Sequence, residues 1–128
     1  MTRHELRVAV FKNIFQIPFY EEDIPEADLD LGEQSPEDLE YISSKVKAIQ
    51  ENLPEIDGII ENVSQGWSVK RLGKAELAIL RLAVYEIRFD DDIPDKVAVN
   101  EAVELAKEYS DEKAASFING VLSGVLAL

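Results

Sequence analysis

Apolar residues recur at intervals of three and four along most of this 128-residue chain, and this spacing limits the folds that the chain can adopt. Such spacing places apolar side chains on one face of an α-helix, whereas a half-buried β-strand needs strict alternation. No run of alternating apolar residues is long enough to indicate a strand. The sequence therefore predicts an all-α protein, a bundle of six to seven helices.

The most apolar of the predicted helices spans residues 72–89. Its apolar side chains fall around most of the helix circumference, which is typical of a helix that other helices surround. These side chains are Leu77, Ile79, Leu80, Leu82, Ala83, Val84 and Ile87. We therefore expect this helix at the centre of the bundle, with Trp67 and Tyr85 also in the core.

An apolar helix is predicted over residues 2–17, and Pro18 stops it, since proline cannot continue a helix. Arg3 and Arg7 lie one turn apart on this helix. Residues that share a helix face in this way point in the same direction. We therefore expect the two arginines to project together.

Two more helices have clear start signals. Ser35 and Pro36 provide a capping hydroxyl and a proline at the first helical position, and Pro54 opens a shorter helix. Between these helices and the first, residues 20–34 mix acids with breakers and a few apolar residues. We interpret that segment as a solvated connection that touches the core at a few points.

Residues 93–122 contain two further helices. Asn100 is expected to cap the first and Ser110 the second, because both side chains accept hydrogen bonds from the free amides of a first turn. Gly120 and Gly124 in the second helix are expected to let a neighbouring backbone come close.

The chain carries a net charge of −13 and no cysteine. The lack of cysteine excludes disulfides and thiolate chemistry and fits a reducing compartment. With no signal peptide and no apolar run of about 20 residues, we expect a cytoplasmic protein with no membrane contact. The acid is concentrated in residues 21–62, which carry −12, whereas residues 1–20 carry +2 and residues 63–128 carry −3. The two ends of the chain can therefore present a locally basic surface.

The carboxylates suggest metal or acid catalysis, but the sequence argues against both. Glu101, Glu104 and Glu108 lie along one helical face, yet a di-iron bundle also needs several histidines, and His4 is the only one. The run from Asp90 to Asp92 lacks the glycine and distal glutamate of a calcium loop, so we interpret it as a solvated loop. One histidine leaves little room for a nucleophile and its base. We predict that the protein is not an enzyme and uses no cofactor and no metal.

Three blocks of sequence follow one another in the second half of the chain. They are Arg71-Leu-Gly-Lys-Ala-Glu-Leu-Ala-Ile-Leu-Arg-Leu-Ala-Val-Tyr-Glu86, Val97-Ala-Val-Asn-Glu-Ala-Val-Glu-Leu-Ala-Lys107 and Phe117-Ile-Asn-Gly-Val-Leu122. Preceded by the arginines of the apolar N-terminal helix, these blocks resemble the NusB family of bacterial transcription antitermination factors. The resemblance covers the whole chain. It implies a single domain, residues 1–128, of two packed three-helix subdomains at about residues 2–62 and 63–128.

The resemblance implies a site for single-stranded boxA-type RNA. Its predicted residues are Arg3, His4, Arg7, Lys113, Phe117 and Asn119. An exposed ring at Phe117 would stack on a base and Lys113 would lie near a phosphate. The residues alone allow other interpretations: the arginines as ordinary solubilising residues, Phe117 as core, and Asn119 as a brace for neighbouring backbone. The N-terminal basic segment is thinner than is usual in the family, so weak RNA affinity is expected without a partner.

The resemblance also implies that Phe15 and Glu76 contact ribosomal protein S10, also called NusE. The complex would join RNA polymerase, suppress termination in ribosomal RNA operons and support ribosome assembly. From the residues alone, Glu76 is also explained as a favourable partner of the helix dipole.

Two other classes stay open: a NusB-like bundle that binds proteins but not RNA, and a stand-alone relative of the RNA-binding helper domain of a ribosomal RNA methyltransferase. The sequence does not decide whether the free protein forms a homodimer.

Overall fold

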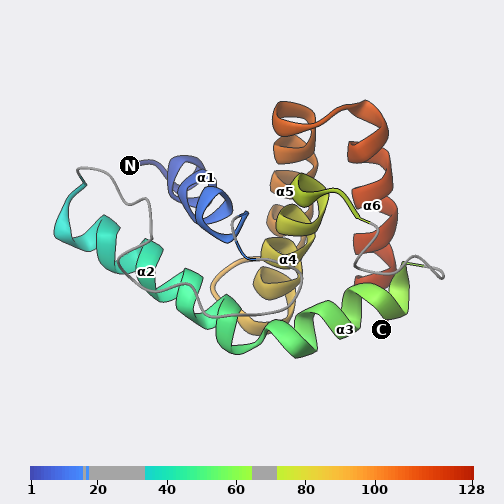
Figure 1. The fold of residues 1–128 in the computed structure, drawn as a ribbon, viewed down its shortest axis with the longest axis horizontal. Coiled ribbons are helices and arrows are strands. Elements are labelled where there is room, and N and C mark those ends of the chain that lie inside the picture. The colour runs from blue at the N-terminus through green and yellow to red at the C-terminus, as the bar shows by residue number, and fades with distance from the viewer. Residues whose placement is uncertain (16, 18–33, 65–71) are drawn as a thin grey trace.

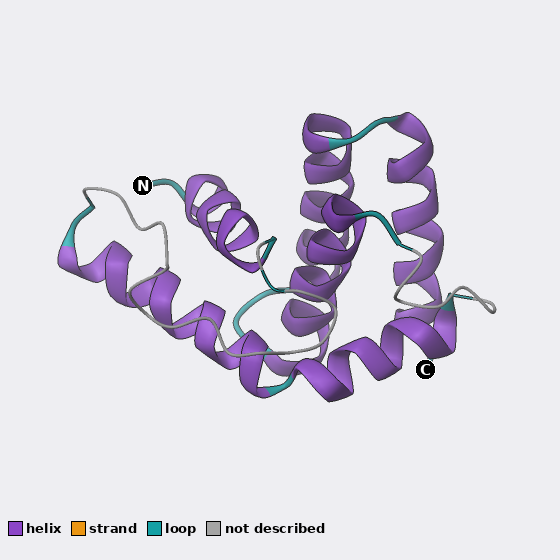
Figure 2. Ribbon diagram, viewed as in Figure 1, coloured by secondary structure: helices purple, strands orange, loops and turns teal. Residues whose placement is uncertain are grey.

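The computed structural model describes residues 1–15, 17, 34–64 and 72–128 of the chain. The regular structure within these residues is helical throughout, which confirms the predicted all-α class (Figure 2). The helices are α1 (Arg3–Ile14), α2 (Pro36–Glu51), α3 (Leu53–Val63), α4 (Lys74–Phe89), α5 (Asp95–Tyr109) and α6 (Glu112–Leu126). The predictions for Trp67 and for most of the acidic connection lie outside the described residues. None of the described helices has the length and apolar character needed to cross a membrane.

Helix α4 lies at the centre of the bundle and contacts each of the other five helices. Every residue from Leu77 to Glu86 is buried, as its apolar circumference predicts. Around it, α2 and α3 follow one another along one edge of the molecule, α5 and α6 run side by side, and α1 lies between α2 and α5 (Figure 1). One apolar core has members from all six helices. Because this core continues across both predicted subdomains, the division between them stays a prediction.

Two buried residues of α4 carry charge, and each is paired by another helix. Arg81, only 1% exposed, donates from Nε and Nη2 to the Asp57 carboxylate of α3 at 2.9 and 2.8 Å. Its Nη1 donates to the Ile17 carbonyl oxygen at 3.2 Å. Glu86 accepts from Arg7 of α1. Since a buried charge without its partner costs about 3–5 kcal/mol, α4 selects its neighbours by charge as well as by shape.

The predicted start of α2 is confirmed. Ser35 Oγ accepts from the Asp38 N–H at 3.2 Å, and Pro36 is the first helical residue. Helix α1 begins with a capping box between Thr2 and Glu5 and ends at Ile14 rather than at residue 17. Side-chain oxygens therefore satisfy free amides at the start of both helices.

The predicted cap at Asn100 is wrong. Helix α5 begins at Asp95, and the Pro94 carbonyl oxygen already accepts from the Ala98 N–H at 3.1 Å. Asn100 consequently lies inside the helix, on its exposed side. The helix starts early because proline, here with φ of −62°, is preset to lead into it.

The predicted cap at Ser110 is also wrong. Asp111 caps α6, its Oδ1 accepting from the Ala114 N–H at 2.7 Å. The Ser110 N–H donates to the Ala106 carbonyl oxygen at 2.8 Å, so Ser110 belongs to the end of α5. Aspartate and serine cap helices about equally well. Asp111 is the cap here because the N–H of Ser110 still takes part in the hydrogen bonding of α5.

The loop after α4 is less solvated than predicted. Asp91 and Asp92 are exposed, but Asp90 is buried and accepts from the Lys45 ammonium of α2. The other oxygen of Asp90 accepts from the Asp92 N–H at 3.1 Å. Asp90 therefore ties the end of α4 to α2.

The two glycines of α6 lie in different surroundings. At Gly124 a Cβ would lie 3.2 Å from the Val63 Cβ, so α6 closely approaches the end of α3 there. At Gly120 nothing lies within 4 Å of that position, and the residue is exposed. The predicted close approach is therefore found at Gly124 and is wrong for Gly120.

We expect Gly120→Ala to raise the free energy of unfolding by about 0.5–1 kcal/mol, because alanine restricts the unfolded chain and its Cβ meets no neighbour. Gly124→Ala should lack this gain, since Val63 must shift to make room. Urea denaturation of the two variants measures the difference. Equal gains would contradict the assigned packing of α6 on α3.

Candidate RNA and protein interface

The three N-terminal residues predicted to bind RNA differ in their exposure to solvent. Arg3 and His4 lie in the exposed first turn of α1. Arg7 is only 7% exposed. The prediction that Arg3 and Arg7 project together is wrong, because the first turn of α1 is open to solvent whereas the second turn is buried against the rest of the bundle.

Arg7 holds α1 to two other helices. Its Nε lies 3.0 Å from Glu86 Oε2 and 3.2 Å from Glu86 Oε1, and its Nη1 lies 3.5 Å from Glu101 Oε1. Burial raises the pKa of Glu86, and the Arg7 guanidinium opposes that rise by favouring the carboxylate. Arg7 thus positions the N-terminal helix against α4 and α5.

His4 faces the carboxylates of α5. Its Nδ1 lies 3.1 Å from Glu101 Oε2, and its Nε2 lies 3.8 Å from Glu108 Oε2. Glu104, between them in sequence, lies 3.9 Å from the Lys107 ammonium instead. Within the described residues, no group of histidine and carboxylate side chains has the arrangement of a metal site.

A groove of about 350 Å³ lies between the start of α4 and the start of α6. It is lined by Leu72, Gly73, Glu76, Asp111, Lys113, Ala114 and Phe117. The Ser110 hydroxyl donates to Glu76 Oε1 at 2.8 Å, which links the end of α5 to this groove. Phe117 is half-buried, so its ring both packs on the core and faces the groove. Lys113 is exposed.

Three aromatic rings form a cluster where α1 meets the end of α5. The buried Phe11 ring lies 6.0 Å from Phe15 and 5.0 Å from Tyr109, measured between centroids. Phe15 is 39% exposed and Tyr109 is 37% exposed. Two partly exposed rings that pack on a buried ring offer a rigid apolar contact area.

Tyr109 continues the three- and four-residue spacing of Val99, Ala102, Val103 and Ala106, and this spacing by itself predicts a buried residue without a role at the surface. The Tyr109 ring is partly exposed because α5 ends at this residue and the chain turns away at Ser110. An aromatic residue in the last helical position, followed by a serine and an aspartate, is the signal that was present in the sequence.

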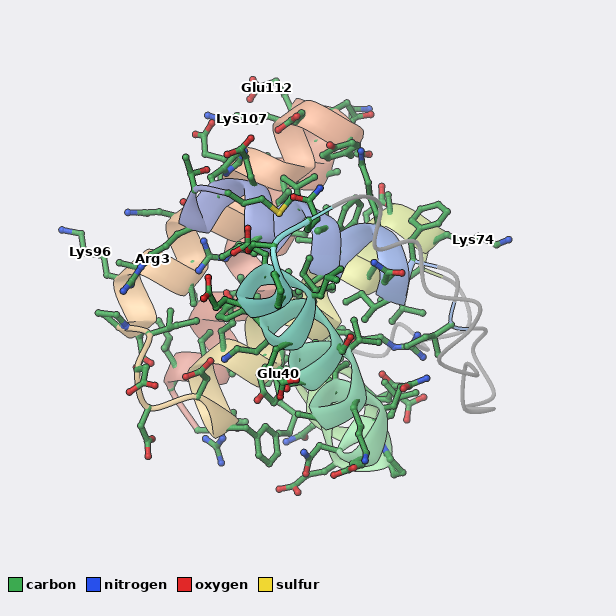
Figure 3. The ribbon with its side chains drawn as sticks, turned by 90° about the vertical axis from the view of Figure 1, so that its left-hand side faces the viewer. Arg3, Glu40, Lys74, Lys96, Lys107 and Glu112 are labelled. Carbon is green, nitrogen blue, oxygen red and sulfur yellow. The ribbon has the colours of Figure 1, made fainter. Side chains whose placement is uncertain are left out.

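The structure brings some predicted residues together and keeps others apart. Glu76, predicted to contact a protein, shares the groove with Lys113 and Phe117, predicted to contact RNA. Arg3 lies at the opposite edge of the molecule from Lys74, the first residue of α4 (Figure 3). The residues from Glu108 to Asp111 connect the two regions, since Glu108 faces His4 and Asp111 lines the groove. Asn119 is exposed on α6.

These features define a class of protein: an all-α bundle with a central buried helix, whose candidate site is an open interface suited to macromolecules rather than an enclosed catalytic pocket. The chain belongs to the NusB family, whose model matches residues 4–127. The family resemblance of the three sequence blocks is thereby confirmed.

Relatives match this chain in sequence and in structure along almost its whole length. The transcription antitermination protein NusB of Lachnoclostridium phytofermentans is 45% identical over 131 residues, which cover 98% of this chain and 99% of that protein. The structure of T. maritima NusB superposes with a TM-score of 0.84 at 34% identity, covering 99% of this chain and 92% of that one. A structure of the antitermination factors NusB and NusE in complex with double-stranded RNA gives a TM-score of 0.82 at 30% identity, covering 99% of this chain and 98% of the matched chain.

The chain is accordingly a transcription antitermination factor of the NusB family, and it is not an enzyme, as the sequence predicts. Its all-α fold is the NusB fold.

Replacing Arg7 tests its assignment as an internal residue. Arg7→Ala should lower the free energy of unfolding by about 3 kcal/mol, because Glu86 is then left buried without its partner. The double variant Arg7→Met, Glu86→Leu should recover most of this loss, since both charges are removed together. Arg3→Ala, the exposed control, should change the value by at most about 0.5 kcal/mol. Urea denaturation measures all three, and equal effects at Arg3 and Arg7 would refute the assignment.

Proposed function

We propose that this protein binds boxA-type single-stranded RNA together with ribosomal protein S10 (NusE) and carries them into the RNA polymerase antitermination complex. It acts in the cytoplasm, suppresses termination in ribosomal RNA operons and supports ribosome assembly. The observation that carries the proposal is the groove in which Glu76 meets Lys113 and Phe117. The related complex of NusB, NusE and double-stranded RNA supports it.

On this proposal RNA contacts two regions. In the groove, Lys113 supplies a cation and the half-buried Phe117 ring supplies a stacking surface that its core contacts hold rigid. At the other end, Arg3 and His4 contact phosphates, and a strand that reaches both regions crosses the end of α5. Asn119 contacts RNA from the exposed side of α6. Arg7 contributes by holding α1 in place rather than by touching RNA.

Ribosomal protein S10 covers the neighbouring surface formed by Phe15, Glu76 and Tyr109. The two rings give apolar contact, and Glu76, held by Ser110, gives a fixed negative charge. Ribosomal protein S10 is basic and this chain carries −13, so opposite charges speed their encounter. Because Glu76 and Phe117 line one groove, bound ribosomal protein S10 lies beside the RNA and extends its basic surface.

Fluorescence anisotropy with a labelled boxA-type oligonucleotide, with and without ribosomal protein S10, tests the RNA contact. Lys113→Ala should weaken binding. It should also make the negative slope of log affinity against log salt shallower by about 0.7, the value of one phosphate contact. Phe117→Leu, which keeps the core filled, should weaken binding about tenfold through lost stacking. Lys47→Ala, an equal charge change at an exposed position of α2, is the control and should leave binding unchanged.

A double-stranded RNA of the same sequence distinguishes the form of RNA that is bound. Tighter binding of the duplex would contradict the single-stranded assignment. No binding of either RNA, with ribosomal protein S10 still bound, would leave the alternative of a bundle that binds only proteins. RNA binding that ribosomal protein S10 neither enhances nor joins would favour the relative of a methyltransferase helper domain.

The protein contact is tested separately. Phe15→Ala and Glu76→Gln should each weaken binding of ribosomal protein S10 about tenfold, as central interface residues do. Tyr41→Ala, which removes a ring of similar exposure on α2, should leave it unchanged. Isothermal titration calorimetry measures the affinities, and an effect at Tyr41 equal to that at Phe15 would overturn the assigned surface. Sedimentation of the free protein shows whether it forms a homodimer.

A further inference from the structure

Two carboxylates of α5, those of Glu101 and Glu108, face His4, which the proposed function assigns to RNA. Glu101 Oε2 lies 3.1 Å from His4 Nδ1, and Glu101 Oε1 lies 3.5 Å from Nη1 of the buried Arg7, which holds the carboxylate in this position. Glu108 adds a second contact to His4 at 3.8 Å. The first turn of α1 therefore meets carboxylates of its own chain before it can meet phosphate.

A phosphate that approaches His4 must overcome this arrangement. The Glu101 carboxylate neutralises the positive charge of the region and repels the incoming anion across a short distance. Glu101 is also only 27% exposed at its side chain, so water screens it less than a fully exposed acid. The buried Arg7 and Glu86 pair fixes α1 and hence keeps His4 beside Glu101.

We propose that Glu101 sets the RNA affinity of the N-terminal region by competing with RNA phosphates for His4. This inference rests on the proposed function, since it concerns the strength of that same RNA contact. Its consequence is that the free protein binds RNA weakly. A basic partner at the neighbouring surface supplies the positive charge that Glu101 cancels.

Helix α5 offers a matched pair of variants. Glu101→Gln removes the charge and keeps a side chain of nearly the same shape. Glu104→Gln makes the same change one turn further on, where the side chain is 64% exposed and lies 3.9 Å from Lys107. We expect Glu101→Gln to raise the affinity for a boxA-type oligonucleotide about fivefold over the wild type at low salt, the effect of one unit charge near one phosphate. Glu104→Gln should change it less than twofold.

A double-mutant cycle separates competition from a change in structure. In a His4→Ala background, the gain from Glu101→Gln should shrink, because the side chain that the substitution frees for RNA is gone. A mere rearrangement of α5 would leave the gain unaltered. Glu108→Gln, which leaves the shorter contact between Glu101 and His4 in place, should give a smaller gain than Glu101→Gln.

The outcomes distinguish this inference from the proposed function. Equal affinities of Glu101→Gln and Glu104→Gln, with the wild type binding RNA, would overturn the role of Glu101 and leave the proposed function intact. If the wild type and both variants fail to bind RNA with or without ribosomal protein S10, the proposed function itself fails. If Glu101→Gln lowers the unfolding midpoint, Glu108→Gln is used in its place, since Glu108 also contacts His4. An RNA affinity of Glu108→Gln equal to that of the wild type would then refute the competition.

Discussion

The burial of α4 by five other helices is the constraint on which the rest of the structure depends. Ten consecutive residues of this helix, from Leu77 to Glu86, are buried, and two of them, Arg81 and Glu86, carry charge. A charge cannot remain buried without a partner, so α3 must bring Asp57 and α1 must bring Arg7. The position of α1, and with it the exposed N-terminal turn, follows from the pairing with Glu86.

The same packing places the candidate interface. The start of α4 carries Glu76 next to the start of α6, so one groove contains residues from two blocks of sequence that lie far apart in the chain. Helix α5 ends beside that groove and also contacts α1 through Tyr109 and Glu108. The end of α5 thereby connects the N-terminal cations to the groove. The charges at this surface are mixed, which makes its affinity for RNA a balance between cations and neighbouring carboxylates.

Local patterns in the sequence predicted the features that depend on local physics. The apolar circumference of residues 72–89 identified the central helix, and Ser35 followed by Pro36 identified the start of α2. Caps were less predictable, because Asn100 and Ser110 have neighbours that start or cap a helix equally well. The Phe11 and Phe15 rings meet at the i, i+4 spacing of one helix, but the contact of Phe11 with Tyr109 joins two helices and is not contained in the spacing along either.

The sequence by itself determined the all-α class, the central helix and the family, because helical periodicity and ordered blocks are properties of neighbouring residues. It also identified the residue types suited to RNA and protein contact. Only the tertiary structure decided which of those residues face solvent: Arg7 is buried against Glu86, whereas Arg3, one turn away, is open. Spacing along one helix defines its faces, but which turns of a face are covered depends on other helices, as the pairing of Arg7 with Glu86 across 79 residues illustrates.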